Sequence, residues 1–379
     1  MKTKIYFFLF IALLTSLSAC KNGKSNQMTG DCENIVVDIS NLEMAQFHEL
    51  IDSVRYIKLK LNPEHPIGRV GKIAFHDSLV YILDDQSDKL FAYNRAGDFR
   101  FVIAAQGMGP DEYTHIQDFT LNLATSTIDL IDASARKIIR YDMHNGTSVQ
   151  IINLPDFAYY LYSIGKDDYL FYDRTQKFSI YNIQSGKEKI IKKLANVYPY
   201  FADNAQFIYR RGDDGSIGLF SIEDNSLYYY EKGKLERKFA FSFKGYLTPA
   251  DFPGDSEQSQ ELENKGASIA ILKDMSDWIY MKYTVNKEHK MYSYLYNKST
   301  KKQYAINAAG FPGFILPELV PQEIIDNNLV MTTNDIPIDA FKSQLHILPN
   351  TPENENFKAL INSVTDDDNP LLQIIYLKK

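Results

Sequence analysis

The sequence predicts an all-β fold, a six-bladed β-propeller of four-stranded antiparallel blades. Two observations carry this prediction. A unit of alternating apolar strands and polar turns recurs along the chain, and only residues 339–364 have a helical pattern. Repeats of about 40 to 50 residues with four strands each are typical of propeller blades. A stack of β-sandwiches is the alternative, but the hairpin-length turns favour the propeller.

The repeat is clearest in DSLVYILDDQSDKLFAYNRAGDFRFVI, from Asp77, and in ATSTIDLIDASARKIIRYDMHNGTSVQII, from Ala124. Further copies begin at residues 166, 215 and 277, and a short strand precedes each copy. One tyrosine recurs in every copy, at Tyr93, Tyr141, Tyr181, Tyr229 and Tyr294. Because it recurs with the strands, we interpret it as packing between blades rather than as a platform for a ligand.

A propeller has to close its ring. SVRYIKLKL, from Ser53, is a lone strand before the first full repeat, and the C-terminal LLQIIYLKK has no strand after it. We predict that this N-terminal strand completes the last blade beside the C-terminal strands. Such a joint removes strand edges that would otherwise pair with other chains.

Four motifs in order carry a family resemblance: SVRYIKLK, HPIGRVGKIAF, SLVYILDDQSDKLFAYNRAGDF and GMGPDEY. They resemble the opening of the six-bladed β-propeller lipoproteins of Bacteroidetes, which are related to the NHL-repeat type. SLYYYEKGKLERKFAFSF and MYSYLYNKSTKKQYAI resemble the fourth and fifth blades of that family. The resemblance covers nearly the whole mature chain and implies the fold, without a settled activity. The sequence departs from the family at Lys60, usually acidic, and at Asp111, usually glycine.

The N-terminus has the parts of a secretory signal. Lys2 and Lys4 precede an apolar run that leads into Leu-Ser-Ala-Cys at residues 17–20, and this run is too short to span a bilayer. The quartet resembles a lipobox, which implies removal of residues 1–19 and lipidation of Cys20. We therefore expect a signal peptide at 1–19, a tether at 20–33 and a single propeller domain at 34–379.

This anchor predicts a location in the bacterial cell envelope, on the outer membrane and facing the periplasm. Residues 21–24, Lys-Asn-Gly-Lys, lack the acidic residues that mark several surface-exposed Bacteroidetes lipoproteins. With Cys20 lipidated, Cys32 has no partner for an intramolecular disulfide. Stability then comes from burial, and 45% of the residues are hydrophobic.

The charge pattern limits the expected partners. The net charge is −7, and the sequence shows no basic blocks of the kind that nucleic-acid-binding proteins carry. We expect a monomer that touches the membrane through its lipid and binds a glycan, a peptide or an envelope protein.

The stretch AAQGMGPDEYTHIQDF, residues 104–119, is the main candidate site. It connects the outer strand of one blade to the inner strand of the next, on the face at the mouth of the central channel. Two interpretations stay open. Gly107 and Gly109 permit positive φ and Pro110 restricts its neighbour, which suits a tight turn between blades. Alternatively, the loop holds a polar ligand site on a rigid scaffold. The ligand-binding candidates are Asp111, Glu112, Tyr113, His115, Arg136 and Arg174.

Aspartate recurs near the end of the second strand of each repeat, at Asp84, Asp132, Asp173 and Asp224. We interpret these residues as turn caps, because a short carboxylate can accept hydrogen bonds from the backbone amides ahead of it. Arg136 and Arg174 lie in the same turns and could recognise an anionic group.

Signatures of catalysis are sparse. The seven histidines are scattered, two cysteines are too few for a thiolate metal site, and no G-x-S-x-G motif occurs. The predicted inner strands show few polar residues, mostly hydroxyls. We expect a binding protein without catalytic residues, metal ligands or cofactor. The alternative is a divalent-metal-dependent hydrolase or lyase, with calcium in the central channel, since oxygen ligands need no local motif.

Overall fold

The computed structural model describes residues 32–172, 177–193, 208–210, 216–222, 224–248, 251, 265–288, 290–307, 321, 323–325, 328–333, 338–347, 350, 352–365 and 367–379. The predicted signal peptide, most of the tether with Cys20, and the candidates Asp173 and Arg174 lie outside these residues.

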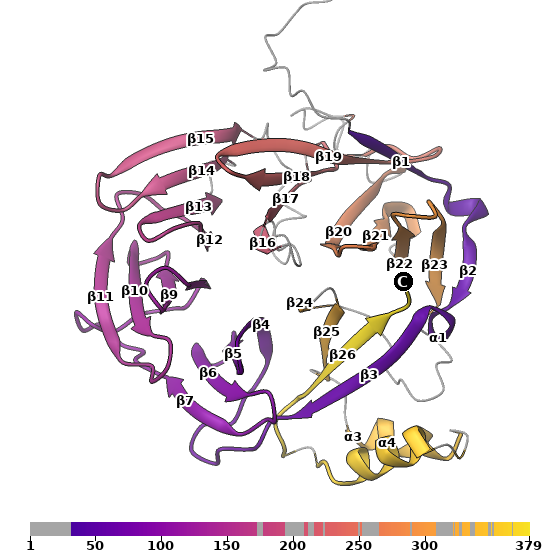
Figure 1. Cartoon of the computed structure of the whole chain (residues 1–379), viewed down its shortest axis with the longest axis horizontal. Coiled ribbons are helices and arrows are strands. Elements are labelled where there is room, and N and C mark those ends of the chain that lie inside the picture. The colour runs from indigo at the N-terminus through magenta and orange to yellow at the C-terminus, as the bar shows by residue number, and fades with distance from the viewer. Residues whose placement is uncertain are drawn as a thin grey trace, which may run out of the picture.

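Six antiparallel blades surround a central axis, each with its first strand innermost (Figure 1). This arrangement confirms the predicted propeller. Blade 1 consists of β4 (Val70–His76), β5 (Leu79–Asp84), β6 (Lys89–Asn94) and β7 (Phe99–Ile103). Blade 2 consists of β8 (Asp118–Asn122), β9 (Thr127–Asp132), β10 (Lys137–Asp142) and β11 (Ser148–Asn153). Blade 3 consists of β12 (Tyr160–Ser163), β13 (Asp168–Tyr172), β14 (Lys177–Asn182) and β15 (Lys187–Lys193).

The remaining blades follow the same order. Blade 4 contains β16 (Ile208–Arg210), β17 (Ile217–Ser221), β18 (Ser226–Glu231) and β19 (Lys234–Phe243). Blade 5 contains β20 (Ala267–Asp274), β21 (Trp278–Val285), β22 (Lys290–Asn297) and β23 (Gln303–Asn307), with η4 (Asn286–Glu288) between β21 and β22. Blade 6 contains β24 (Glu323–Ile325), β25 (Asn328–Thr332), β26 (Leu371–Leu377) and β3 (Ile51–Lys58).

The N-terminal segment contributes one strand to each of three blades. β3 pairs antiparallel with β26, with Tyr56 opposite Gln373, which confirms the predicted closure. Ahead of it, β1 (Glu33–Val37) pairs in parallel with β19, and β2 (Glu43–Gln46) pairs in parallel with β23. Neither strand is predicted from the sequence, because each is short and its partner is far along the chain. η1 (Ile39–Asn41) and α1 (Phe47–Leu50) connect the three.

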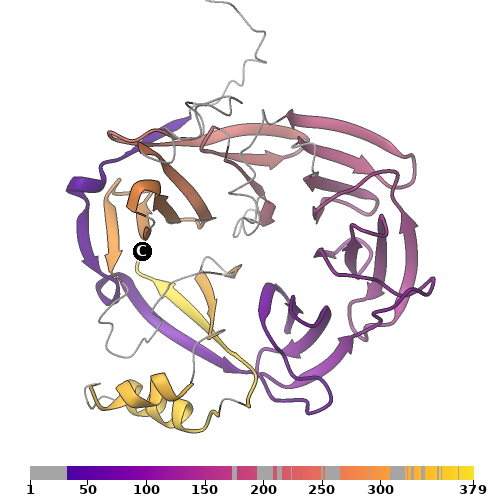
Figure 2. The same cartoon turned by 180° about the vertical axis from the view of Figure 1, so that it is seen from behind.

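A short helical insertion separates β25 from β26, in the segment with the helical pattern. It contains α3 (Ile338–Gln344), η5 (Leu345–Ile347) and α4 (Pro352–Asn362). The Phe357 ring of α4 lies 5.1 Å from the Tyr56 ring of β3, so the insertion packs on the outer strand of blade 6. Seen from behind, the helices lie outside the ring next to β3 (Figure 2). Within the described residues, no helix has the length and apolar character needed to cross a membrane.

The five recurring tyrosines are all buried in apolar clusters that combine residues of neighbouring blades, which confirms their assignment to packing between blades. Two of the hydroxyls reach neighbouring blades: Tyr93 accepts a hydrogen bond from Asn369 at 3.1 Å, and Tyr229 donates to Asp274 of β20 at 2.5 Å. In these two residues the apolar ring lies in the core while the hydroxyl has a hydrogen-bond partner.

The antiparallel order sends the connections between blades to one face of the ring. Connections 59–69, 104–117 and 154–159 lie there, together with turns 85–88 and 133–136. We call this the connection face. Turns such as 123–126 and 164–167, which join first and second strands, lie on the opposite face.

Candidate functional site

The loop 104–117 is held by both blades that it joins. Tyr113 is buried, and its hydroxyl donates to the carbonyl oxygen of Asp88 at 2.7 Å. The Asp88 carboxylate faces Nδ1 of His115 at 2.6 Å and accepts the amide of Ile116 at 3.1 Å. On the other side, Thr114 donates from its amide and hydroxyl to Asp132, at 2.7 and 2.8 Å. The loop is therefore fixed between blades 1 and 2.

Glu112 shapes the tip of this loop. Its carboxylate accepts the amide of Gly109 at 2.7 Å, and its carbonyl oxygen accepts the side chain of Lys137. A Cβ atom at Gly107 would lie 2.0 Å from the same carboxylate. Neither Gly107 nor Gly109 has positive φ. The predicted conformational reason for Gly107 is therefore wrong, because the position needs space for Glu112.

A double-mutant cycle tests this arrangement. Gly107→Ala is expected to cost about 1 kcal/mol of unfolding free energy, because the Glu112 carboxylate has to leave the Gly109 amide. In a Glu112→Ala background the same substitution is expected to cost much less, since the obstacle is gone. Urea unfolding of the four proteins measures the coupling. Equal costs in both backgrounds would contradict the steric explanation.

The loop leaves only part of its polar set exposed. Asp111, His115 and Arg136 are exposed, whereas Tyr113 is buried and Glu112 is engaged inside the loop. Arg136 adopts φ of 52° and its guanidinium lies 5.6 Å from the ring of Phe157, in the next connection. Met108, at the tip, is 95% exposed. The connection face thus presents an apolar tip beside three charged or titratable side chains.

Asp84 and Asp132 each accept hydrogen bonds from two different segments of the chain. Asp84 accepts amides from its own turn, Gln86 at 3.0 Å and Ser87 at 3.2 Å, and also the amides of Gly68 and Arg69 from the connection that arrives from blade 6. Asp132 likewise accepts the amide of Ala135 at 2.9 Å in addition to Thr114 of the incoming connection. Each aspartate therefore ties its turn to the preceding blade.

These hydrogen bonds outweigh desolvation. Burial alone would raise the pKa of Asp84, but the Ser87 hydroxyl and the amides of Gly68, Arg69 and Gln86 lower it overall. The pKa of Asp132 is lowered in the same way by Ala135 and Thr114, against the effect of burial. Both carboxylates stabilise the fold as anions.

The prediction for Asp224 is wrong in register. The second strand of blade 4 ends at Ser221, opposite Ser226, so Asp224 lies inside the turn. Its carboxylate accepts the Tyr228 hydroxyl and lies 3.2 Å from Nζ of Lys192 in blade 3. Buried Ile222 extends the apolar pattern past the strand, which explains the misplaced boundary.

Four charged side chains from different inner strands gather around the axis: Lys72, Asp118, Lys273 and Glu323. We call this set the inner charged cluster. Nζ of Lys72 lies 2.7 Å from the Asp118 carboxylate, which also accepts the amide of Leu161 in blade 3 at 3.0 Å. The expectation that inner strands carry few polar groups, mostly hydroxyls, is therefore wrong. Single residues in separate strands gave no visible motif, and only ring closure brings them together.

Burial has the largest effect on the pKa values of three residues in this cluster. It raises the pKa of Asp118 and of Glu323, and it lowers the pKa of Lys273 to about 8. Lys273 and Glu323 attract each other, which partly offsets the desolvation of both. Charges around the axis thus carry a cost that their pairing reduces.

Lys273 predicts a pH dependence of stability. Its pKa falls from 10.5 in the unfolded chain to about 8 in the fold, so the unfolded state holds the extra proton between these values. The unfolding free energy should therefore rise with pH, by about 2 kcal/mol between about pH 8 and 9.5. Lys273→Met removes this rise and serves as the reference for tyrosine ionisation. Urea unfolding across this range checks it, and parallel curves for both proteins would contradict the assignment.

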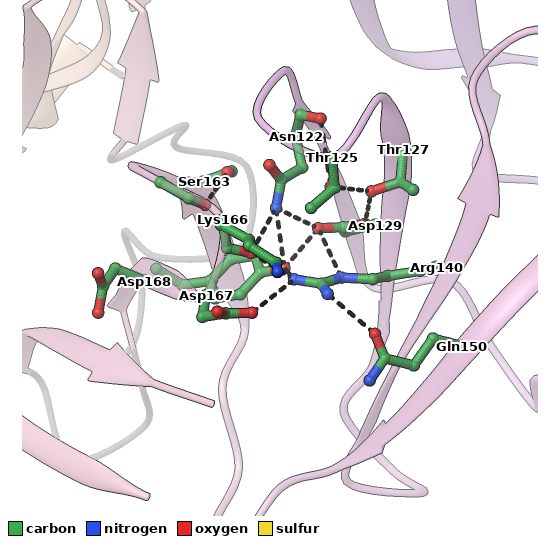
Figure 3. Close-up of polar contacts among 12 residues, drawn as sticks. Asn122, Thr125, Thr127, Asp129, Arg140, Gln150, Ser163, Lys166, Asp167 and Asp168 are labelled. Carbon is green, nitrogen blue, oxygen red and sulfur yellow. Dashed lines mark hydrogen bonds and ion pairs between the residues drawn. The ribbon is translucent and has the colours of Figure 1, made fainter. Parts of the chain in front are cut away.

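A buried polar network joins blades 2 and 3 near the opposite face (Figure 3). The carboxylate of Asp129 accepts the Thr127 hydroxyl at 2.6 Å and the Asn122 amide at 3.1 Å, and it also accepts the hydroxyl of Tyr169. Arg140 donates to the Lys166 carbonyl oxygen at 2.6 Å and to Tyr169 at 2.8 Å.

This network is structural. Asp129 and Arg140 are almost fully inaccessible to solvent, so no ligand reaches them in this arrangement. Burial raises the pKa of Asp129, and Thr127 and Tyr169 partly offset this effect. The sequence signal was a charged residue inside an apolar strand, TIDLID, which predicts a buried partner but does not identify it. In the described part of the chain, no three His, Cys, Asp or Glu side chains gather in a way that could hold a metal ion.

Two solved structures resemble this chain in fold. The crystal structure of a "Putative exported protein" from Bacteroides fragilis NCTC 9343 matches with a TM-score of 0.71 at 18% identity, over 91% of this chain and 100% of that one. A DUF4221 family member from Bacteroides vulgatus ATCC 8482 matches with a TM-score of 0.51 at 12% identity, over 87% and 97%. No curated protein matches the chain. The model of a family described as "Domain of unknown function (DUF4934)" matches residues 32–376, so the chain belongs to the DUF4934 family.

Proposed function

We propose that this protein is an exported, lipid-anchored propeller of the cell envelope that binds a protein or peptide partner through its connection face. The signal and the Leu-Ser-Ala-Cys quartet at residues 17–20 support export and lipidation. The similar Bacteroides fragilis structure carries a description as an exported protein, in agreement with this location.

The observation that carries the binding proposal is the exposure of Met108. This side chain is 95% exposed, yet its loop is hydrogen-bonded to two blades. Neighbouring connections of the same face present Leu61, 38% exposed, and Phe157, 45% exposed. Contiguous apolar patches rimmed by polar residues mark sites that bind proteins, and we propose that these three side chains contribute to such a site. A rigid loop also loses little conformational entropy on binding.

A photocrosslinking experiment in cells tests the proposal. We would place p-benzoylphenylalanine at Met108 and, as the matched control, at Leu123, which is 45% exposed in a turn of the opposite face. A discrete crosslinked partner at Met108 and none at Leu123 is expected, and Phe157→Ser should weaken that crosslink. Identical products at both positions, or none at Met108, would overturn the proposal.

The lipid anchor has its own test. Cys20→Ala is expected to abolish incorporation of an alkyne-labelled fatty acid, whereas Cys32→Ala should leave labelling intact. The pair is matched because these are the only two cysteines. Equal labelling of the Cys20→Ala protein and the unmodified protein would rule out this anchor.

A second candidate function is a divalent-metal-dependent hydrolase or lyase. It is favoured by one observation, the presence of two carboxylates, Asp118 and Glu323, on inner strands of different blades. Such an enzyme should melt at a higher temperature with calcium and return to its starting value with EDTA. Asp118→Asn should then remove the calcium effect. A calcium effect that persists in Asp118→Asn would place the metal elsewhere.

A further inference from the structure

Basic side chains gather on β15, the outer strand of blade 3, and on the first half of β19 in blade 4, ahead of the part that pairs with β1, although the whole chain has a net charge of −7. β15 reads KEKIIKK, and β19 begins KLERK. These strands lie at neighbouring parts of the rim in Figure 1. The fold therefore builds a patch that the sequence order separates. We call it the basic rim, and its residues are Lys187, Lys189, Lys192, Lys193, Lys234, Arg237 and Lys238.

Much of this charge is not neutralised. Lys192 pairs with Asp224 at 3.2 Å, and Lys238 pairs with Glu236 at 2.5 Å. Glu188, the acidic residue of β15, is engaged by Lys177 at 2.9 Å. Four lysines of the basic rim are exposed and form no ion pair with the described residues: Lys187, Lys189, Lys193 and Lys234.

Protection of a strand edge does not explain this charge. Lysines on an edge strand do hinder pairing with other chains, but blades 1 and 2 expose equivalent outer strands. β7, FRFVI, has Arg100 as its sole charged residue, and β11, SVQIIN, has none. If edge protection were the reason, these strands would need lysines as much as β15 does.

The basic rim lies next to the point where the N-terminal segment joins the ring. The described chain starts at Cys32, and β1 pairs directly with β19 of blade 4, so the N-terminus joins the ring at this rim. The segment from Cys20 to Cys32 spans at most about 40 Å when extended. A lipid on Cys20 would therefore keep this side of the propeller close to the membrane.

We infer that the basic rim docks on anionic lipid headgroups of the membrane that holds the anchor. This inference rests on the proposed lipidation of Cys20. Lysines near a membrane surface each add attraction to anionic lipid. Ile190, 42% exposed among these lysines, can enter the headgroup region. The docked propeller stands on its edge, and the connection face points sideways, open to a partner.

Vesicle sedimentation tests the surface without the lipid. The protein is the chain from Lys21, which keeps every described element. It is mixed with vesicles containing phosphatidylglycerol or with vesicles of phosphatidylcholine alone. Binding to the anionic vesicles is expected, weakening with salt. Lys187→Gln/Lys189→Gln/Lys193→Gln should reduce it about tenfold or more.

The control removes the same charge from blade 5. Lys287, Lys290 and Lys302 are exposed and form no ion pair with the described residues, and their replacement by Gln should leave binding unchanged. Melting curves of both variants confirm that they fold. Equal loss in the two variants, absence of binding to the anionic vesicles, or binding to heparin but not to vesicles would overturn the inference. Crosslinking at Met108 does not depend on these lysines, so the two proposals can fail separately.

Discussion

Deletion of residues 371–379 is expected to unfold the whole propeller rather than one blade. β26 is an interior strand of blade 6, between β25 and β3. Leu371 and Leu372 are fully buried and Ile375 is almost so. Removing three such side chains costs about 2–5 kcal/mol each, which together is as large as the roughly 5–15 kcal/mol that stabilises a typical domain. The loss also frees β3, which closes the ring.

Circular dichroism and tyrosine fluorescence should report this loss together. A truncated protein that keeps the melting curve of the full chain would contradict the closure argument.

The complementary variant is a cross-strand disulfide, Ser53→Cys/Tyr376→Cys, at positions that face each other in the β3 and β26 pair. With Cys32→Ser in the background, its oxidised form should melt at a higher temperature than its reduced form.

Asp118→Asn is expected to cost about 3 kcal/mol of unfolding free energy, because it leaves the partly buried Lys72 ammonium without its anionic partner. Asparagine keeps an oxygen to accept the Leu161 amide, so the change isolates the charge. The Lys72 and Asp118 side chains are 19% and 5% exposed, which limits solvent screening. The double variant Lys72→Met/Asp118→Leu should recover much of the loss, since the charge is gone.

The matched control is an exposed pair between the connection 59–69 and blade 1, Lys60 and Asp98, whose side chains are 69% and 41% exposed. Asp98→Asn should lower the free energy of unfolding far less than Asp118→Asn does, because water already screens the pair. Urea unfolding of the unmodified protein and of these three variants gives the comparison. If Asp118→Asn costs no more than Asp98→Asn, the inner charged cluster does not hold the blades together.

The loop 104–117 shows which features of the candidate site can be predicted from local sequence. Its glycines and its place between two strands were readable, because turn residues and strand periodicity are local properties. The partners of its side chains were not. Tyr113 and Thr114 bind Asp88 and Asp132, which belong to two different blades. A polar residue in a sequence does not reveal whether its hydrogen bonds go to the protein or remain for a ligand.

The sequence alone determined the blade architecture, the joint between β3 and β26, and the buried tyrosines, because alternation, turn chemistry and repetition are written along each strand. Tertiary structure alone decided what separate strands share. Three features join residues that lie far apart in the sequence: the parallel pairings of β1 with β19 and of β2 with β23, the inner charged cluster, and the basic rim. Their interactions depend on distance in space, and only the closed ring sets those distances.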